Sequence, residues 1–266
     1  MTSRCLASAT DASLRRYLGL RWNAGGFPHR NLSVNRSIIE GLTGRSWKDF
    51  EALHSVEDYD AAVARCTNWR DFYQREFGLR EDMLETAGRM WTRSHLTDET
   101  PVVPFSGVLE TLQALAHLPH GIVSQNSRQI IEATLDPLGL GDRFEHVIGY
   151  EQVAPGRQKP APDGLLECLE RMTALGPGAA FYVGDHPTDA MCVAQARREM
   201  ISRGLEIRVW SIAVLYGGES VDGWPEAPDF LARTPEEIIE IVGREAHCQQ
   251  PVRGVESASH DREEMA

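Results

Sequence analysis

The second part of the chain alternates short apolar segments with amphipathic ones, and this alternation limits the possible folds more than any other feature. Strands are expected in the apolar segments 121–124, 146–149, 180–184 and 209–217. Between them, apolar residues recur at the three- and four-residue spacing that predicts helices, for example around Leu112, Ile131 and Leu169. Alternating strands and helices are typical of βαβ units, so the predicted fold class is α/β with a parallel sheet.

The first part of the chain is predicted to be helical. Apolar residues at helical spacing run through residues 37–53, 60–77 and 81–96, and no segment there shows the alternation of a strand. The change between the two parts falls near residues 98–108. We therefore expect a helical region followed by an α/β region.

Composition and charge argue against several classes of protein. The chain of 266 residues has 39 acidic and 27 basic side chains, which disfavours a nucleic-acid surface with clustered Lys and Arg. No apolar run approaches the roughly 18 residues of a membrane span, and the 5 cysteines lack the spacing of a zinc site or a disulfide framework. We expect a soluble, cytoplasmic protein, although the Arg and Ser content of the first residues leaves an organelle address open.

Two aspartates follow the predicted strand 180–184. Asp185 comes directly after the strand, the pair His186-Pro187 is suited to begin a helix, and Asp189 lies one turn later. Carboxylates placed together in this way can hold Mg²⁺, which takes few protein carboxylates and keeps several waters. The alternative is that both aspartates are helix caps that interact with the helix dipole.

Two other loops at predicted strand ends carry polar residues. Ser124 is followed by Gln125 and Asn126 at a helix start, where a hydroxyl and backbone N–H groups can bind phosphate, or where Ser or Asn can simply cap the helix. Lys159 lies in the loop "KPAP", whose stiff backbone can hold the lysine beside a phosphoryl group. The alternative for Lys159 is an ordinary solvated side chain. Ligands of parallel α/β sheets bind beyond the carboxyl ends of the strands, which favours the functional interpretation.

The order and spacing of these residues resemble the haloacid dehalogenase superfamily of hydrolases, in its phosphoglycolate phosphatase-like branch with a helical cap. Ser124 follows one strand, Lys159 lies 35 residues later, and Asp185 of "VGDxxxD" follows 26 residues after that. The segments "PFSGVLETLQALAHL" and "PDFLARTPEEIIEIV" are also similar to parts of the family core. The resemblance covers residues 104–242.

The resemblance implies a fold, which is a Rossmann-like parallel sheet core with an inserted N-terminal α-helical cap. Residues 1–14 would be a degenerate or truncated start of the core, and residues 15–98 would be the cap. Residues 99–243 would form the α/β core, and residues 244–266 a disordered tail.

The resemblance also implies a chemistry, the hydrolysis of small phosphate monoesters through an aspartyl-phosphate. In this scheme Ser124 hydrogen-bonds the phosphoryl group and Lys159 stabilises the developing charge. The substrate-binding residues would be Ser124, Gln125, Asn126 and Lys159, the catalytic residues Asp11, Ser124 and Lys159, and the Mg²⁺ ligands Asp185, Asp189 and Asp11.

The family's first motif, an apolar strand ending in Asp-x-Asp-Gly-Thr, has no clear counterpart in this chain. The closest stretch is "ASATDASL", in which Ala9 takes the place of the nucleophile and Asp11 that of the general acid and base. A shifted alignment makes Asp11 the nucleophile but lacks the second aspartate. The low apolar content of "RCLASA" argues against a buried strand, so residues 1–14 can equally be a leader without a role in the site.

Three functions remain open from the sequence. The first is Mg²⁺-dependent hydrolysis of a small phosphorylated metabolite, with catalytic competence depending on the degenerate first motif. The second is a non-catalytic relative that binds a phosphorylated ligand or a partner. The third and least favoured is a haloacid dehalogenase, which needs the same missing aspartate and no metal.

Six aromatic residues of the helical region can line a substrate pocket or simply form the core of that region: Trp47, Phe50, Trp69, Phe72, Tyr73 and Trp91.

Overall fold

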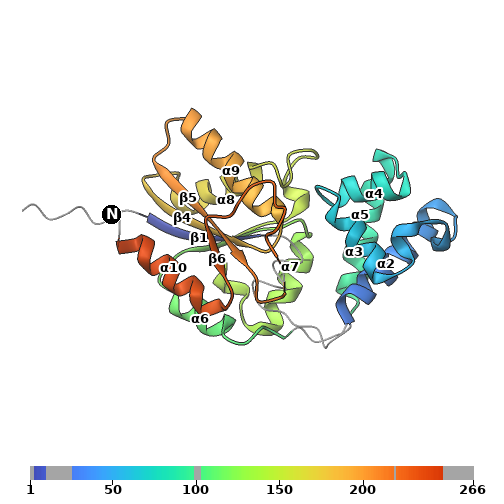
Figure 1. The fold of residues 1–266 in the computed structure, drawn as a ribbon, viewed down its shortest axis with the longest axis horizontal. Helices are drawn as coiled ribbons and strands as arrows, with labels where there is room; N and C mark the ends of the chain where they lie inside the picture. The colour runs from blue at the N-terminus through green and yellow to red at the C-terminus, as the bar shows by residue number, and fades with distance from the viewer. Residues whose placement is uncertain (1–2, 10–25, 99–102, 219, 248–266) are drawn as a thin grey trace, which may run out of the picture.

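The chain forms a parallel β-sheet with helices on both faces and a separate helical bundle beside it (Figure 1). This computed structural model describes residues 3–9, 26–98, 103–218 and 220–247. The bundle lies past the end of the sheet at which β1 finishes (Figure 1). It therefore stands over the carboxyl ends of the strands, where ligands of α/β proteins bind.

In the part of the chain that the structure describes, the sheet has 6 strands in the order β3-β2-β1-β4-β5-β6, and all neighbouring pairs are parallel. Strands β2 and β3 lie on one side of β1, and the later strands β4, β5 and β6 lie on its other side. The carboxyl ends of β1 and its neighbours therefore form the crevice of a topological switch point. The strands are β1 (Ser3–Ala9), β2 (His120–Val123), β3 (His146–Ile148), β4 (Gly178–Gly184), β5 (Ile207–Val214) and β6 (Phe230–Ala232).

Strand β1 pairs with β2 on one side and with β4 on the other, so the expectation that "RCLASA" would not form a strand of the core sheet was wrong. Ala9 is level with Val123 of β2, and Ser8 is level with Val183 of β4. Pairing on both sides supplies the backbone hydrogen bonds, and this tertiary context overrides the weak strand propensity of the sequence. Asp11, the residue predicted to act here, lies outside the described residues.

Strand β4 shows how the core divides between the two faces of the sheet. All its residues are buried, as expected for a central parallel strand. Tyr182 packs with α8 and α9 on one face, whereas Phe181 and Val183 pack with α10 on the other. The flanking helices are α6 (Val108–Ala114), α7 (Arg128–Leu135), α8 (Asp163–Thr173), α9 (Pro187–Ser202) and α10 (Pro235–His247).

Helix α10 corrects one predicted boundary. The polar tail was expected to begin at residue 244, but the helix continues to His247. Ile238, Ile241 and Val242 are buried against the sheet, and this anchored face lets the helix extend by another turn before it ends. The rest of the predicted tail lies outside the described residues.

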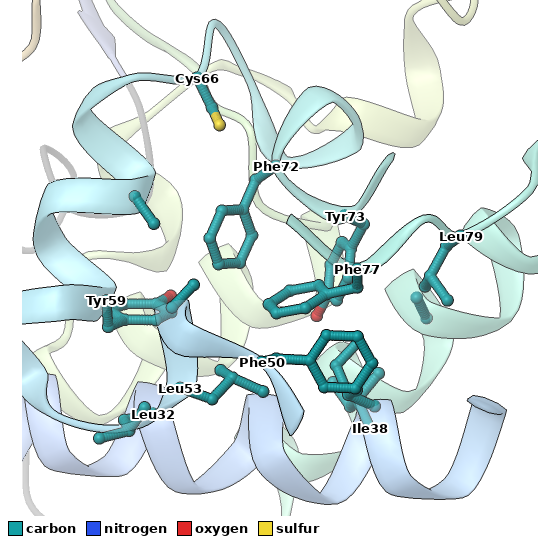
Figure 2. Packing of buried hydrophobic residues seen from close by; sticks show 14 of the residues in the cluster. Leu32, Ile38, Phe50, Leu53, Tyr59, Cys66, Phe72, Tyr73, Phe77 and Leu79 are labelled. Atoms are coloured by element: carbon teal, nitrogen blue, oxygen red, sulfur yellow. The ribbon is translucent and has the colours of Figure 1, made fainter. Parts of the chain in front are cut away.

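Within the described residues, the bundle contains four helices with a hydrophobic core of their own (Figure 2). Aromatic rings dominate that core, and Phe72 and Phe77 meet edge to face at 5.0 Å between ring centroids. The helices are α2 (Gly26–Thr43), α3 (Val56–Ala64), α4 (Trp69–Phe77) and α5 (Glu81–Leu96).

Short 3₁₀ turns occur in both regions. They lie at Trp47–Asp49 and Glu51–Leu53 in the bundle, and at Asp136–Leu138, Gly141–Arg143 and Tyr150–Gln152 in the sheet region. The boundary assigned to a cap domain from the sequence stays a prediction.

In the described part of the chain, every helix is too short or too polar to cross a lipid bilayer.

Strand β2 begins with a buried histidine that makes the stability of the fold depend on pH. The Nδ1 atom of His120 lies 2.8 Å from the carbonyl oxygen of Leu118, and its Nε2 atom has no hydrogen-bond partner among the described residues. Burial, reinforced by the charge of Arg143, lowers the pKa of His120 from 6.5 to about 4. The unfolded chain therefore takes up this proton at a higher pH than the folded chain, and acidification favours unfolding.

We expect His120→Asn to reduce the acid sensitivity of the fold, because Asn can still donate to Leu118 but does not titrate. Between about pH 7.5 and about pH 4.5, the free energy of unfolding of the wild type should fall by about 2 kcal/mol more than that of the variant. Urea unfolding at both pH values measures this difference. An equal fall in the two proteins would contradict the assignment of the acid sensitivity to His120.

Candidate active site

Ser124 lies directly beyond the end of β2 and is 5% exposed. Its Oγ accepts a hydrogen bond from the backbone N–H of Asn126 at 3.0 Å. The N-cap of α7 is instead Ser127, whose side chain accepts from the N–H of Ile130, so the capping alternative does not apply to Ser124. Within the described residues the hydroxyl of Ser124 donates no hydrogen bond, and it can therefore donate one to a ligand.

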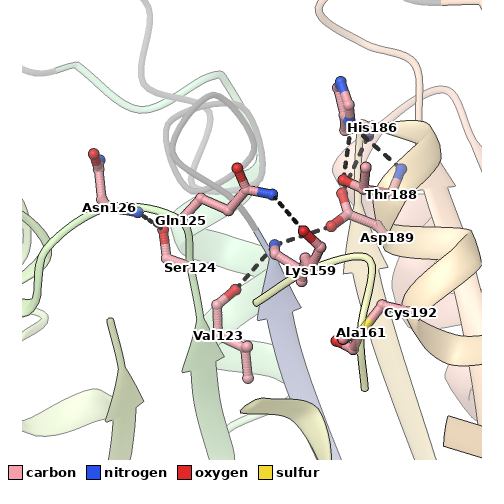
Figure 3. Close-up of polar contacts among 10 residues, drawn as sticks. All are labelled: Val123, Ser124, Gln125, Asn126, Lys159, Ala161, His186, Thr188, Asp189 and Cys192. Atoms are coloured by element: carbon pink, nitrogen blue, oxygen red, sulfur yellow. Dashed lines mark hydrogen bonds and ion pairs between the residues drawn. The ribbon is translucent and has the colours of Figure 1, made fainter. Parts of the chain in front are cut away.

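Lys159 is buried, which excludes the alternative of a solvated loop lysine. It is 4% exposed, and its Nζ donates to the carbonyl oxygen of Val123 at 3.2 Å and to Oδ1 of Asp189 at 3.0 Å (Figure 3). Burial lowers the pKa of Lys159, and the carboxylate of Asp189 opposes that shift. An ammonium group has three N–H donors, so one remains for a ligand once these two contacts within the described residues are made.

Asp189 caps helix α9 and holds Lys159 at the same time. Its Oδ2 accepts from the backbone N–H of His186 at 3.1 Å, while its Oδ1 binds Lys159. Gly184 makes this arrangement possible, since a Cβ atom there would lie 2.3 Å from Oδ2 of Asp189. Both oxygens of Asp189 therefore make hydrogen bonds within the protein, and its predicted role as a metal ligand stays a prediction.

Asp185 is the carboxylate that best fits a Mg²⁺ ligand. It follows β4, beside the carboxyl end of β1, and is 5% exposed. Mg²⁺ is typically held by one or two carboxylates together with substrate oxygens and waters, so a single buried carboxylate at this edge is compatible with such an ion. No group of three or more potential metal ligands occurs among the residues that the structure describes, and the further predicted ligand Asp11 lies outside them.

Gln125 and Asn126, predicted as substrate-binding residues, connect parts of the site to one another. The side chain of Gln125 donates to the carbonyl oxygen of Lys159 at 3.3 Å (Figure 3). Trp91 of helix α5 donates from its indole N–H to Oδ1 of Asn126 at 3.4 Å. The loop after β2 thus contacts both the lysine loop and the helical bundle.

A cavity of about 180 Å³ lies between the bundle and the carboxyl edge of the sheet. Gln125 and Asn126 belong to its wall, and so does His186, which follows Asp185 in the chain. The cavity is lined by Asn35, Tyr59, Val63, Cys66, Thr67, Asn68, Trp69, Phe72, Tyr73, Gly88, Trp91, Gln125, Asn126, Tyr150 and His186.

The cavity separates the aromatic residues of the bundle into two sets. Trp69, Phe72, Tyr73 and Trp91 belong to its wall, whereas Trp47 and Phe50 belong to the helical core and are absent from that wall. Asn35 and Tyr150 also belong to the wall, and neither was predicted as a site residue from the sequence. Tyr150 could have been predicted as a site residue, because it closely follows strand β3 at the carboxyl edge of the sheet. Asn35 lies within a helix, and the sequence around it contains no feature that indicates a site.

The comparisons with known proteins agree with this arrangement. A sequence profile of haloacid dehalogenase-like hydrolases matches residues 52–202, which is more than half of the chain. The chain belongs to the haloacid dehalogenase-like hydrolase family. This confirms the family that the motifs around Ser124, Lys159 and Asp185 indicated.

Relatives of characterised function are matched over part of their length. The phosphoglycolate phosphatase of Escherichia coli K12 is 28% identical over 144 residues, which are 52% of this chain and 51% of that protein. The phosphoglycolate phosphatase of Synechococcus elongatus is 30% identical over 141 residues, which are 52% of this chain and 58% of that protein. The chain thus spans about half the length of the curated relatives it matches.

Solved structures resemble the chain over nearly its whole length. A haloacid dehalogenase-like protein of Bacteroides fragilis has a TM-score of 0.64 at 20% identity, and the alignment covers 90% of this chain and 100% of that one. The protein CbbY of Rhodobacter sphaeroides, solved in complex with phosphate, has a TM-score of 0.59 at 15% identity, with 90% of this chain and 96% of that one covered. At these identities the likeness concerns the fold, and it confirms the predicted α/β class with a helical cap.

The ion pair of Lys159 and Asp189 is expected to couple the stability of the segments that it joins. Lys159→Met and Asp189→Asn should each lower the free energy of unfolding by about 3–5 kcal/mol, because each leaves one buried charge without its partner. The double variant should lose less than the sum of the two by about 1–3 kcal/mol. Urea unfolding of the four proteins measures this coupling, and strictly additive losses would show that the two side chains do not act as a pair.

Proposed function

We propose that this chain hydrolyses small phosphate monoesters with the help of Mg²⁺. The observation that carries the proposal is the buried ammonium group of Lys159, which is fixed at the carboxyl edge of the sheet by its hydrogen bonds to Val123 and Asp189. A dianionic phosphoryl group is the ligand that best matches a fixed cation, a hydroxyl donor and a nearby metal site. The family and the phosphatases among its relatives support the same chemistry.

Each residue has a definite task in this proposal. Ser124 donates its hydroxyl hydrogen to one phosphoryl oxygen, and Lys159 directs its remaining N–H at another. Phosphoryl transfer depends mainly on positioning and on stabilising charge on these oxygens, so such fixed donors favour the reaction. Asp185 would hold Mg²⁺, which when bound neutralises part of the phosphoryl charge. The helical bundle over the edge keeps bulk water away from the site.

The attacking group in this proposal is Asp11. One carboxylate oxygen forms a bond to phosphorus while the bond from phosphorus to the ester oxygen breaks, and the leaving alkoxide takes a proton from solvent water to become the alcohol. A water molecule then attacks the acyl phosphate, which releases inorganic phosphate and restores the carboxylate.

The cytoplasm, where small phosphorylated metabolites are found, is the proposed location of the protein. The buried thiols of Cys66, Cys168 and Cys192 are unpaired, which is compatible with it.

A specific observation favours a second function, the binding of phosphorylated ligands without turnover. Strand β1 ends in Ala9 between β2 and β4. In the unshifted alignment with the family this residue takes the nucleophile's place, and alanine has no group that can attack phosphorus. In that case Ser124, Lys159 and Asp185 would still bind a phosphorylated metabolite.

An assay of phosphate release from a panel of monoesters, with and without Mg²⁺, tests the first function. We expect Mg²⁺-dependent release, a loss in kcat/KM of about hundredfold or more in Asp185→Asn, and no turnover in Asp11→Asn. Asp142→Asn, which changes an exposed aspartate in the turn before β3, should behave as wild type.

The same proteins distinguish the second function from the first. If no ester is hydrolysed but phosphate raises the melting temperature in the presence of Mg²⁺, the chain is a binding protein and the nucleophile is absent. If phosphate neither binds nor is released, both proposals fail.

A further inference from the structure

The cavity next to the candidate phosphoryl site contains no charged side chain of the Lys, Arg, Asp or Glu type among its described wall residues. At about 180 Å³ it is comparable with the apolar cavity of about 150 Å³ that accommodates benzene in another protein. The wall is built mainly from rings and aliphatic groups. These features suit one uncharged group of the size of a ring.

The polar groups at the bundle end of the cavity are neutral and bound to one another. The amide of Asn35 accepts from the hydroxyl of Tyr73 at 2.6 Å and donates to the hydroxyl of Tyr59 at 3.1 Å. It also donates to the carbonyl oxygen of Asn31 at 2.9 Å. Burial raises the pKa of Tyr73 well above its usual value, which keeps that hydroxyl protonated. This end of the cavity offers no cation.

Two charged residues adjoin Trp69 and Phe72 of the cavity wall in the sequence, and neither offers a free cation: Arg70 is neutralised and Asp71 is negative. The guanidinium of Arg70 lies over the ring of Trp69 at 4.6 Å and is bound by Glu81 and Glu85. Asp71 accepts from the backbone N–H of Thr67, a residue of the cavity wall, at 2.9 Å. A carboxylate placed at the bundle end of the cavity would therefore lose its water without gaining a cation from the described wall residues there, which is unfavourable.

Contacts between the bundle and the sheet region join the two walls of the cavity. The ring of Trp69 meets the ring of Tyr150 edge to face at 5.2 Å between centroids. Gly88 permits the close approach of helix α5, because a Cβ atom there would lie 2.8 Å from the hydroxyl of Tyr150. The side chain of Thr92 donates to that of Ser127 at 3.1 Å. These contacts hold helix α5 of the bundle against the sheet region beside the cavity.

The cavity also reaches the edge at which a phosphoryl group would lie. Gln125, Asn126 and His186 line it and are the chain neighbours of Ser124 and Asp185. A monoester with its phosphoryl group at that edge therefore directs its alcohol part into the cavity.

We infer that the substrate is the phosphate monoester of an uncharged, ring-sized apolar alcohol, an inference that rests on the proposed phosphoryl site. Phosphoglycolate appears in the names of the relatives. It differs from such a substrate because its alcohol part is small and carries a negatively charged carboxylate. The preference for a neutral group comes from the cavity wall of this chain, in particular from Asn35, Tyr73 and Trp69.

A matched pair of esters tests the charge preference separately from size. We expect kcat/KM for 4-carbamoylbenzyl phosphate to exceed that for 4-carboxybenzyl phosphate by at least about tenfold, because the two differ in charge but hardly in shape. Benzyl phosphate should likewise be preferred over phosphoglycolate. Equal or higher kcat/KM for the carboxylates would overturn the inference.

A cation introduced into the wall should change this preference. Val63 of α3 lines the cavity and is partly buried, and Val63→Lys should reduce the ratio of the two kcat/KM values by about tenfold or more. Val63→Gln, which is similar in length but uncharged, should leave the ratio near that of the wild type. If Lys and Gln have the same effect, the alcohol part does not occupy the cavity.

Binding of phosphonates separates a failure of this inference from a failure of the proposed catalysis. If no ester is hydrolysed, calorimetric titration with benzylphosphonate and with phosphonoacetate in the presence of Mg²⁺ still compares an apolar with a carboxylated ligand. Tighter binding of benzylphosphonate by about tenfold or more would support the inference in a non-catalytic protein. Tighter binding of phosphonoacetate, or no binding of either, would overturn it.

Discussion

The ion pair of Lys159 and Asp189 is the interaction on which the rest of the site depends. Both side chains are nearly inaccessible to solvent, at 4% and 3% exposed, and a buried charge is tolerated only when it is paired and hydrogen-bonded. The pair joins the lysine loop to the start of α9, and the contact of Lys159 with Val123 adds the end of β2. Segments that are distant in the chain are thereby held in one geometry at the edge of the sheet.

The site divides into a charged half and an uncharged half. At the sheet edge, Ser124, Lys159 and Asp185 present a donor, a cation and a carboxylate, whereas the cavity above them is walled by rings and neutral amides. A phosphate monoester has the same division between its anionic phosphoryl group and its alcohol part. The sheet can therefore supply the chemistry while the helical bundle selects the alcohol. Under this division, a member of the family can keep the motifs around Ser124, Lys159 and Asp185 and still act on a different substrate from its relatives.

The sequence was sufficient to predict the elements whose signals are local. Strand β4, the proline at the start of α9 and the apolar faces of the flanking helices follow from residues that are close together in the chain. Strand β1 was not predictable from its composition, because its stability comes from neighbours on both sides that are far away in the chain.

The positions of individual site residues were predictable, but their contacts were not. The strand ends indicated Ser124, Lys159, Asp185 and Asp189 as candidates. That Asp189 would bind Lys159 depends on a contact across 30 positions of the chain, and no spacing rule gives it. Likewise, Phe50 and Trp69 share the same helical periodicity, so only packing decides that Trp69 lines the cavity and Phe50 does not.

The central claim is that the sheet edge around Lys159 binds a phosphoryl group, and calorimetric titration with inorganic phosphate in the presence of Mg²⁺ tests it most directly. The account predicts that the wild type binds phosphate and that Ser124→Ala weakens the binding by about fivefold or more, through the loss of one hydrogen bond to a charged ligand. Ser202→Ala, at the far end of α9, should not change the affinity. Absence of phosphate binding, or unchanged affinity in Ser124→Ala, would contradict the account.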